Sequence, residues 1–163
     1  MKSAAIVLAL ILLGSARAMA IAPENVLKLI QDHGAQAAEA KLWGTKEWDE
    51  MIRGVASGES EWLTVAEKLL PGTDAGSNSE LFDAVAWALP KAPANVLGLV
   101  SRKRGDWESV CSGPPVDFPP PGDSKSYFKR ATEAVAGVSN KDLQRVRNEC
   151  LTRLAKAAER AQP

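Results

Sequence analysis

Apolar residues recur every three or four positions along most of this chain, and a glycine or proline ends nearly every such run. The clearest run has steps of 3, 4, 4, 3 and 4 along Leu143, Val146, Cys150, Leu154, Ala157 and Ala161. This spacing places the side chains on one face of a helix. No segment alternates between apolar and polar residues for long enough to predict a strand. The pattern therefore predicts an all-α fold of about seven helices, either a compact bundle or a short array of helical hairpins.

Polar residues before the apolar runs predict where helices begin. Thr45, Ser60 and Ser139 are each expected to cap a helix through a side-chain oxygen. Ser77 and Glu80 have the spacing of a capping box, in which each side chain accepts a backbone N–H of the other residue. The apolar faces include Trp48, Trp62 and Trp87, so we expect these three tryptophans to build the core.

A proline-rich stretch interrupts the helical pattern at residues 113–122. It contains five prolines in ten residues. Proline lacks the backbone N–H and clashes with the preceding turn, so this stretch cannot lie inside a helix. The stretch is expected to be an extended polyproline connection or a rigid strap laid over the surface of a single helical domain, residues 21–163.

The first 20 residues have the three parts of a secretory signal peptide. Lys2 is followed by the apolar run 4–14, and small residues then offer cleavage after Ala18 or Ala20. The apolar run is shorter than the roughly 20 residues that cross a bilayer, although a retained membrane anchor is the alternative interpretation. Residues 1–20 are therefore predicted to be removed, which leaves a periplasmic or secreted protein with no transmembrane span.

Cys111 and Cys150 are the only two cysteines. Export to an oxidising compartment favours a disulfide between them. Free thiols or a bridge between two molecules are the alternatives. A redox-active pair is not expected, because the Cys-x-x-Cys spacing that tunes such thiols is absent.

A possible internal repeat of 34–35 residues covers about residues 23–105. The motif Asn-Val-Leu-x-Leu occurs at residues 25–29 and 95–99, and Glu-Trp-Leu-Thr-Val lies halfway at 61–65. Helical hairpins of about 34 residues form stacked arrays. Any two amphipathic helices can also be aligned in this way, so a true repeat and a coincidence both remain open.

The charge pattern argues against nucleic acid as a partner. After residue 20 the chain has 18 basic and 20 acidic residues, with the excess of acid before residue 123 and an excess of base after it. Nucleic-acid-binding domains usually carry a strongly basic patch. An acidic body would instead suit a basic protein partner.

The sequence contains no recognisable catalytic or metal-binding motif. His33 is the single histidine, so a histidine-rich zinc site is excluded and a catalytic triad is not expected. Asp74 and Asn78 lack the ligand spacing of a calcium-binding EF-hand loop. The acidic residues between 47 and 67 are best interpreted as solvated helix faces. We expect no catalytic residues, no metal and no cofactor.

These observations predict an exported, non-catalytic protein-interaction module, for example an inhibitor or immunity-type partner of a secreted protein. Glu47 and Glu50 are candidate partner-binding residues because they lie in the acidic stretch. Trp43 and Trp107 are candidates because they lie near helix ends, where tryptophan can be exposed and anchor an interface. A hydrolase of envelope polymers that uses helix-borne carboxylates is the alternative, and a purely structural envelope protein is the third hypothesis.

Overall fold

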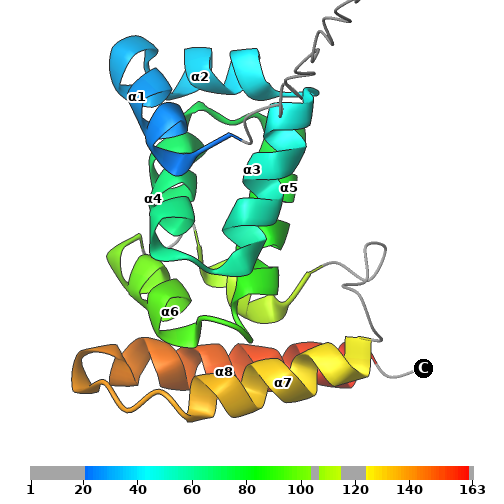
Figure 1. Cartoon of the computed structure of the whole chain (residues 1–163). Coiled ribbons are helices and arrows are strands. Elements are labelled where there is room, and N and C mark those ends of the chain that lie inside the picture. Colours follow the sequence, from blue (N-terminus) through cyan, green and yellow to red (C-terminus); the bar gives the residue numbers. More distant parts are fainter. Residues whose placement is uncertain (1–20, 104–106, 115–123, 162–163) are drawn as a thin grey trace, which may run out of the picture.

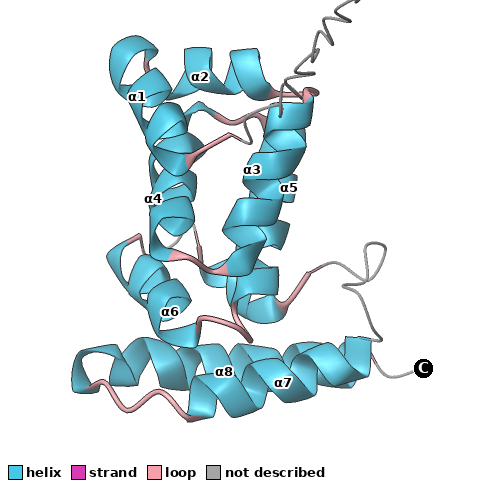
Figure 2. Ribbon diagram, viewed as in Figure 1, coloured by secondary structure: helices cyan, strands magenta, loops and turns pink. Residues whose placement is uncertain are grey.

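The computed structural model describes residues 21–103, 107–114 and 124–161. The predicted signal peptide and residues 115–122 of the proline-rich connection lie outside these ranges. The described residues form no strand, and the all-α prediction is confirmed (Figure 2). Their α-helices are α1 Pro23–His33, α2 Ala35–Leu42, α3 Lys46–Ser57, α4 Ser60–Leu69, α5 Ala75–Ala88, α6 Pro93–Arg102, α7 Ser124–Ala136 and α8 Gln144–Arg160.

Three short 3-10 helices complete the secondary structure: η1 Leu70–Gly72, η2 Glu108–Ser112 and η3 Lys141–Leu143. The α3, α4 and α5 helices run along the long direction of the molecule, and α1 and α2 cover one end (Figure 1). At the other end, α7 and α8 form an antiparallel pair that lies across α6. We refer to α1–α6 with η2 as the body, and to α7 and α8 as the C-terminal hairpin.

The helix starts agree only partly with the sequence predictions. Thr45 caps α3 as expected, since its side chain accepts the backbone N–H of Trp48. The predicted box at Ser77 and Glu80 is wrong, because α5 begins three residues earlier, after Asp74. The Asp74 carboxylate accepts the N–H groups of Ser77 and Gly76, which lower its pKa, and the Ser77 hydroxyl accepts the N–H of Asp74.

Two other predicted caps are also replaced. Ser60 is the first residue of α4 rather than its cap. The turn that leads to α8 is held by Asn140 instead of Ser139, and the Asn140 side chain accepts the N–H of Asp142. In both places a neighbouring residue takes the extended backbone conformation that a cap requires.

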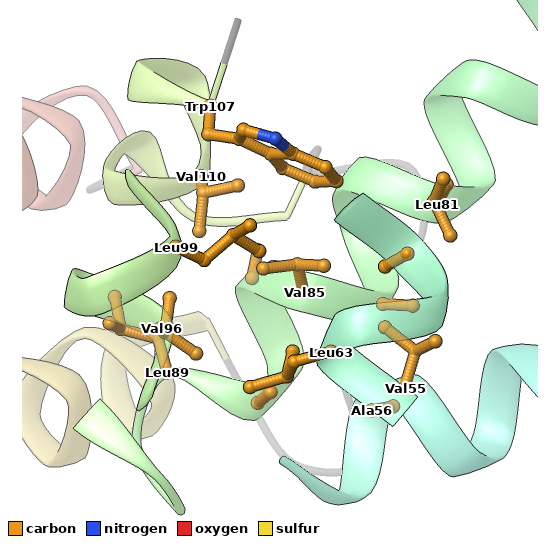
Figure 3. Close-up of a cluster of buried hydrophobic side chains, with 14 of the residues drawn as sticks. Val55, Ala56, Leu63, Leu81, Val85, Leu89, Val96, Leu99, Trp107 and Val110 are labelled. Carbon is orange, nitrogen blue, oxygen red and sulfur yellow. The ribbon is translucent and has the colours of Figure 1, made fainter. Parts of the chain in front are cut away.

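A continuous apolar core runs through the body into the C-terminal hairpin. Figure 3 shows part of it, where side chains of α3, α4, α5 and α6 meet those of η2. Trp48 is buried at the α3–α5 contact, and its indole N–H donates to Glu80 at 2.7 Å. Burial of a tryptophan normally requires such a partner for its polar edge.

Small residues let some helices approach closely. A Cβ atom on Gly54 of α3 would lie 2.5 Å from the Trp62 indole of α4, so only glycine allows that ring to lie on α3. Residues aligned by the 34-residue offset lie on neighbouring helices, α3 beside α5 and α4 beside α6. Ordinary bundle packing produces the same neighbours, so the repeat stays a prediction.

The structure contains the expected disulfide between Cys111 and Cys150. Both residues are buried, Cys111 in η2 and Cys150 on the inward face of α8. The bond therefore ties the C-terminal hairpin to the body. None of the helices in the described ranges has the length and apolar character needed to cross a bilayer.

Candidate binding groove

A groove lies on the surface between α3 and α5 and reaches α7. It consists of two adjoining hollows of about 550 and 400 Å³ that share Ile52 and Trp87. We call it the α3–α5 groove. Its lining residues are Ile52, Arg53, Ala56, Gly76, Ser79, Glu80, Asp83, Trp87, Pro90, Lys91, Tyr127 and Arg130.

The centre of the groove is apolar. Ile52 of α3 and Trp87 of α5 are only half-buried, although both pack against the core. Ile52 lies one step around α3 from the fully buried Met51, at the edge of the apolar stripe. The Trp87 indole nitrogen is buried and has no hydrogen-bond partner among the described residues. Trp87 and Ile52 therefore form an apolar platform that is open to a ligand from one side.

One end of the groove is basic. Arg53 comes from α3, Lys91 from the loop after α5, and Arg130 from α7. The Lys91 ammonium donates to the carbonyl of Ala56 at 2.6 Å, so its position is fixed against the end of α3. Arg53 and Arg130 are exposed and form no ion pair with any described residue.

Tyr127 holds α7 in place at this basic end. Its hydroxyl donates to the Ala86 carbonyl at 2.8 Å and thereby joins α7 to α5. Burial raises the pKa of the Tyr127 hydroxyl well above its usual value. The hydroxyl therefore remains a donor at physiological pH, and the first turns of α7 are held beside the groove.

The other end is acidic and belongs entirely to α5. Glu80 and Asp83 are three positions apart and so lie on the same side of the helix. Glu80 accepts the Trp48 indole N–H. Burial, and secondarily the Glu80 charge, raise the pKa of Asp83 to about 6. Asp83 is thus ionised at neutral pH and becomes neutral in mildly acidic solution.

Trp43 extends the acidic end as an exposed aromatic surface. It is 38 % exposed, the largest exposure of a large apolar side chain in the described residues. Its ring contacts Trp48 edge-on, with the ring centroids 4.9 Å apart. A Cβ on Gly76 would lie 3.2 Å from the Trp43 ring, so glycine at this position leaves room for the indole beside the groove.

The structure does not bring the four predicted partner-binding residues together. Glu47 is exposed on α3 and does not line the groove. Glu50 accepts the backbone N–H of Ile21 at 3.1 Å. Trp107 was expected near the surface, and that expectation is wrong: its side chain is fully buried, with its ring centroid 4.6 Å from that of Phe82. Of the four, only Trp43 lies next to the groove.

The sequence pattern predicted Trp87 in the core and did not single out Arg53 or Asp83. A usable signal was nevertheless present on α5. Glu80, Asp83 and Trp87 follow each other at steps of three and four, so two acids and a tryptophan share one helix face. A tryptophan next to acids on one face marks the edge of an apolar stripe.

A second cleft lies where η2 meets α8 and is much more polar. It is lined by Glu108, Ser112, Glu149, Thr152, Arg153, Lys156 and Arg160. Arg153 and Glu108 form an ion pair across it. The described residues that line this cleft include no exposed aromatic or large aliphatic side chain, so they do not provide the apolar anchor that the α3–α5 groove has.

The described residues contain no group of three or more histidine, cysteine or acidic side chains placed to hold a metal ion. His33 lies exposed in the last turn of α1. Comparison with protein families, with curated proteins and with solved structures finds no match to this chain.

Proposed function

We propose that this chain is an exported, non-catalytic interaction protein that binds a segment of a partner protein in the α3–α5 groove. The observation that carries the proposal is one groove with an exposed apolar centre and opposite charges at its ends. Interface hot spots are typically a central aromatic anchor surrounded by polar contacts. Trp87 with Ile52 provides the anchor, and the two charged ends provide orientation.

The groove specifies the chemistry of its occupant. An apolar side chain would lie on Ile52 and Trp87. A lysine or arginine of the partner would pair with Glu80 and Asp83, and an aspartate or glutamate would pair with Arg53 and Arg130. Such a dipolar arrangement fixes the direction in which the segment lies, because the reversed segment would place like charges together. We further propose that the partner is a secreted protein and that binding in the groove inhibits it.

Export is part of the same proposal and is supported by two observations. The first 20 residues have the sequence of a signal peptide. The disulfide fits an oxidising compartment, since such bonds are rare where thiols are kept reduced.

A second candidate function, hydrolysis of an envelope polymer, is favoured by one observation. Glu80 and Asp83 are neighbouring carboxyl groups in a groove, and the pKa of Asp83 is raised to about 6, as that of a general acid is. Glycosidases place two carboxylates on opposite sides of the bond that they cleave. Both groups here lie on one wall, because both come from the same face of α5. Binding is therefore the better-supported function.

The test is a selection of random peptides displayed on phage against the protein recovered from the periplasm of an exporting host. We expect winners with an apolar residue between a basic and an acidic residue, binding in the micromolar range. Arg53→Glu should weaken binding of these winners about tenfold by reversing one end. Arg145→Glu, an exposed charge on α8 outside the groove, is the matched control and should have no effect.

Three outcomes would contradict the proposal. Winners without this charge order would show that the groove does not select a dipolar segment. Equal affinity in Arg53→Glu and in Arg145→Glu would place binding elsewhere. Turnover of a polysaccharide that Asp83→Asn abolishes would instead establish the hydrolase.

A further inference from the structure

The first described residue, Ile21, is held against the body at two points. Its side chain is half-buried against the core, and its backbone nitrogen donates to Glu50 Oε2 at 3.1 Å. The next residue, Ala22, is the N-cap of α1, and its carbonyl accepts the N–H of Asn25 at 3.0 Å. The backbone nitrogen of Ile21 is thus placed at a half-buried carboxylate by the packing of its own side chain and by the position of Ala22 at the start of α1.

This nitrogen is also the atom that signal cleavage after Ala20 would release. Hydrolysis of the Ala20–Ile21 peptide bond adds the hydroxyl of water to the Ala20 carbonyl carbon and a proton to the Ile21 nitrogen. The new amine has an ordinary pKa near 8, so it takes up a further proton at neutral pH and becomes an ammonium. A neutral amide that donates to Glu50 would then become a cation at the same carboxylate.

We propose that the chain is processed after Ala20 and that the new Ile21 α-ammonium forms an ion pair with Glu50, which ties the mature N-terminus to α3. This inference goes beyond the groove and rests only on the export part of the proposed function. Charge-assisted hydrogen bonds are about twice as strong as neutral ones, so processing itself strengthens the contact.

The geometry separates the two cleavage sites that the sequence leaves open. Cleavage after Ala18 would leave Met19 and Ala20 in front of Ile21. The Ile21 nitrogen would remain a neutral amide, and two more residues could move the ammonium up to about 7 Å along the chain. Only cleavage after Ala20 creates the cation where Glu50 already accepts a hydrogen bond.

The contact also assigns a role to Glu50 that differs from partner binding. Glu47, one turn earlier on α3, is exposed and has no such contact. The two residues look equivalent in the sequence, since both lie in the same acidic stretch. In the structure Glu50 accepts a hydrogen bond from the backbone of Ile21, whereas Glu47 is exposed on the surface.

The experiment exports the full chain in five versions: wild type, Glu50→Gln, Ala20→Leu, the double variant of these two, and the control Glu47→Gln. Leucine at position 20 removes the small residue needed before the cleaved bond and should move cleavage to Ala18. Glutamine at position 50 keeps the hydrogen-bond acceptor and removes only the charge. Intact-mass spectrometry gives the first residue of each product, and calorimetry gives each thermal midpoint.

We expect wild type to begin at Ile21 and Ala20→Leu at Met19. Glu50→Gln should lower the midpoint by about 2–4 °C in the wild-type background and by less than about 1 °C in the Ala20→Leu background. Glu47→Gln is the matched control and should leave the wild-type midpoint unchanged. An unprocessed wild-type product, a first residue other than Ile21, or an equal effect of Glu50→Gln in both backgrounds would overturn the proposal. An unprocessed wild-type product would also count against export, whereas a different first residue or an equal effect of Glu50→Gln would leave export intact. Peptide binding in the groove is a separate measurement that none of these results decides.

Discussion

The two ends of the α3–α5 groove are built in different ways. The acidic end uses Glu80 and Asp83, both on one helix of the body. The basic end uses Arg53 and Lys91 of the body but also Arg130 of α7, so it is complete only when the C-terminal hairpin is docked. The acidic end therefore keeps its geometry as long as α5 is folded, whereas the basic end also requires the contact between the body and α7.

The two regions are also held together differently. The body buries large side chains such as Trp48, Leu81 and Leu89. The C-terminal hairpin also buries large side chains, Tyr127, Phe128 and Leu154, and in addition it is fastened to the body by the disulfide. The basic end of the groove therefore depends on this apolar contact and on a covalent bond that limits how far α7 and α8 can move from the body.

Removing the disulfide should produce the largest difference in stability between the basic end and the acidic end of the groove. We expect the double substitution Cys111→Ser with Cys150→Ser to lower the free energy of unfolding by about 4 kcal/mol, as the loss of a loop of this length does in the chain-entropy view. Denaturant titration measures the loss. Hydrogen exchange should increase more in α7 and α8 than in α3 and α5, and uniform acceleration would contradict the comparison.

A substitution in the core beneath α5 should destabilise the helix that carries the acidic end of the groove. Leu81 is fully buried on α5, between Glu80 and Asp83 in the chain. Leu81→Ala should cost about 3 kcal/mol of stability because it leaves a cavity in the core. The same titration checks this value. A loss below about 1 kcal/mol would show that α5 is not anchored as described.

Removal of the Tyr127 hydroxyl tests the contact between the body and the C-terminal hairpin by deleting a single oxygen atom. Tyr127→Phe keeps the ring and removes the hydrogen bond to the Ala86 carbonyl. We expect a loss of about 1.5 kcal/mol and weaker binding of acidic peptide ends, since Arg130 follows Tyr127 by one helical turn. Unchanged stability and unchanged binding would mean that α7 is positioned without this bond.

The raised pKa of Asp83 gives a pH dependence of known sign. The folded carboxyl has a pKa of about 6 and the unfolded one about 3.8. The folded state therefore binds more protons between these values, and its stability from this group falls as pH rises through that window and stays lower above pH 6. Asp83→Asn removes the penalty. It should be more stable than wild type at pH 7 by about 1 kcal/mol, allowing for partial exposure, and equal to it near pH 3.

The control for this prediction is Asp49→Asn, a substitution of an exposed carboxylate on α3. Thermal midpoints of both variants and wild type between pH 3 and pH 8 measure the dependence. A stability difference between Asp83→Asn and wild type that does not change with pH would contradict the assigned pKa.

Local signals predicted much of the fold. The helical periodicity, the Thr45 cap and the cysteine pair each depend on neighbouring residues or on pairing by elimination, and each is confirmed. The start of α5 was mispredicted because two capping boxes overlap. Asp74 with Ser77 is used, while Glu80 instead accepts a hydrogen bond from Trp48, 32 residues away in sequence.

The site was less predictable because it depends on contacts between distant segments. Trp107 is buried since η2 packs against α5, and nothing in the residues around it indicates that contact. The spacing of Trp87 from Glu80 and Asp83 indicates the edge of an apolar stripe, but only the path of the neighbouring helices leaves one side of the ring open. Which apolar residue is exposed at the edge of a stripe is a tertiary property.

The most direct test of the central claim is an NMR titration of the exported protein with a selected peptide, observing its backbone amide signals and the indole N–H signals of its five tryptophans. We predict that the Trp87 signal shifts strongly and Trp43 moderately, while Trp62, buried against Gly54, stays in place. Shifts confined to Thr152 and Lys156 in the polar cleft, with Trp87 unchanged, would contradict the assignment of the α3–α5 groove as the binding site.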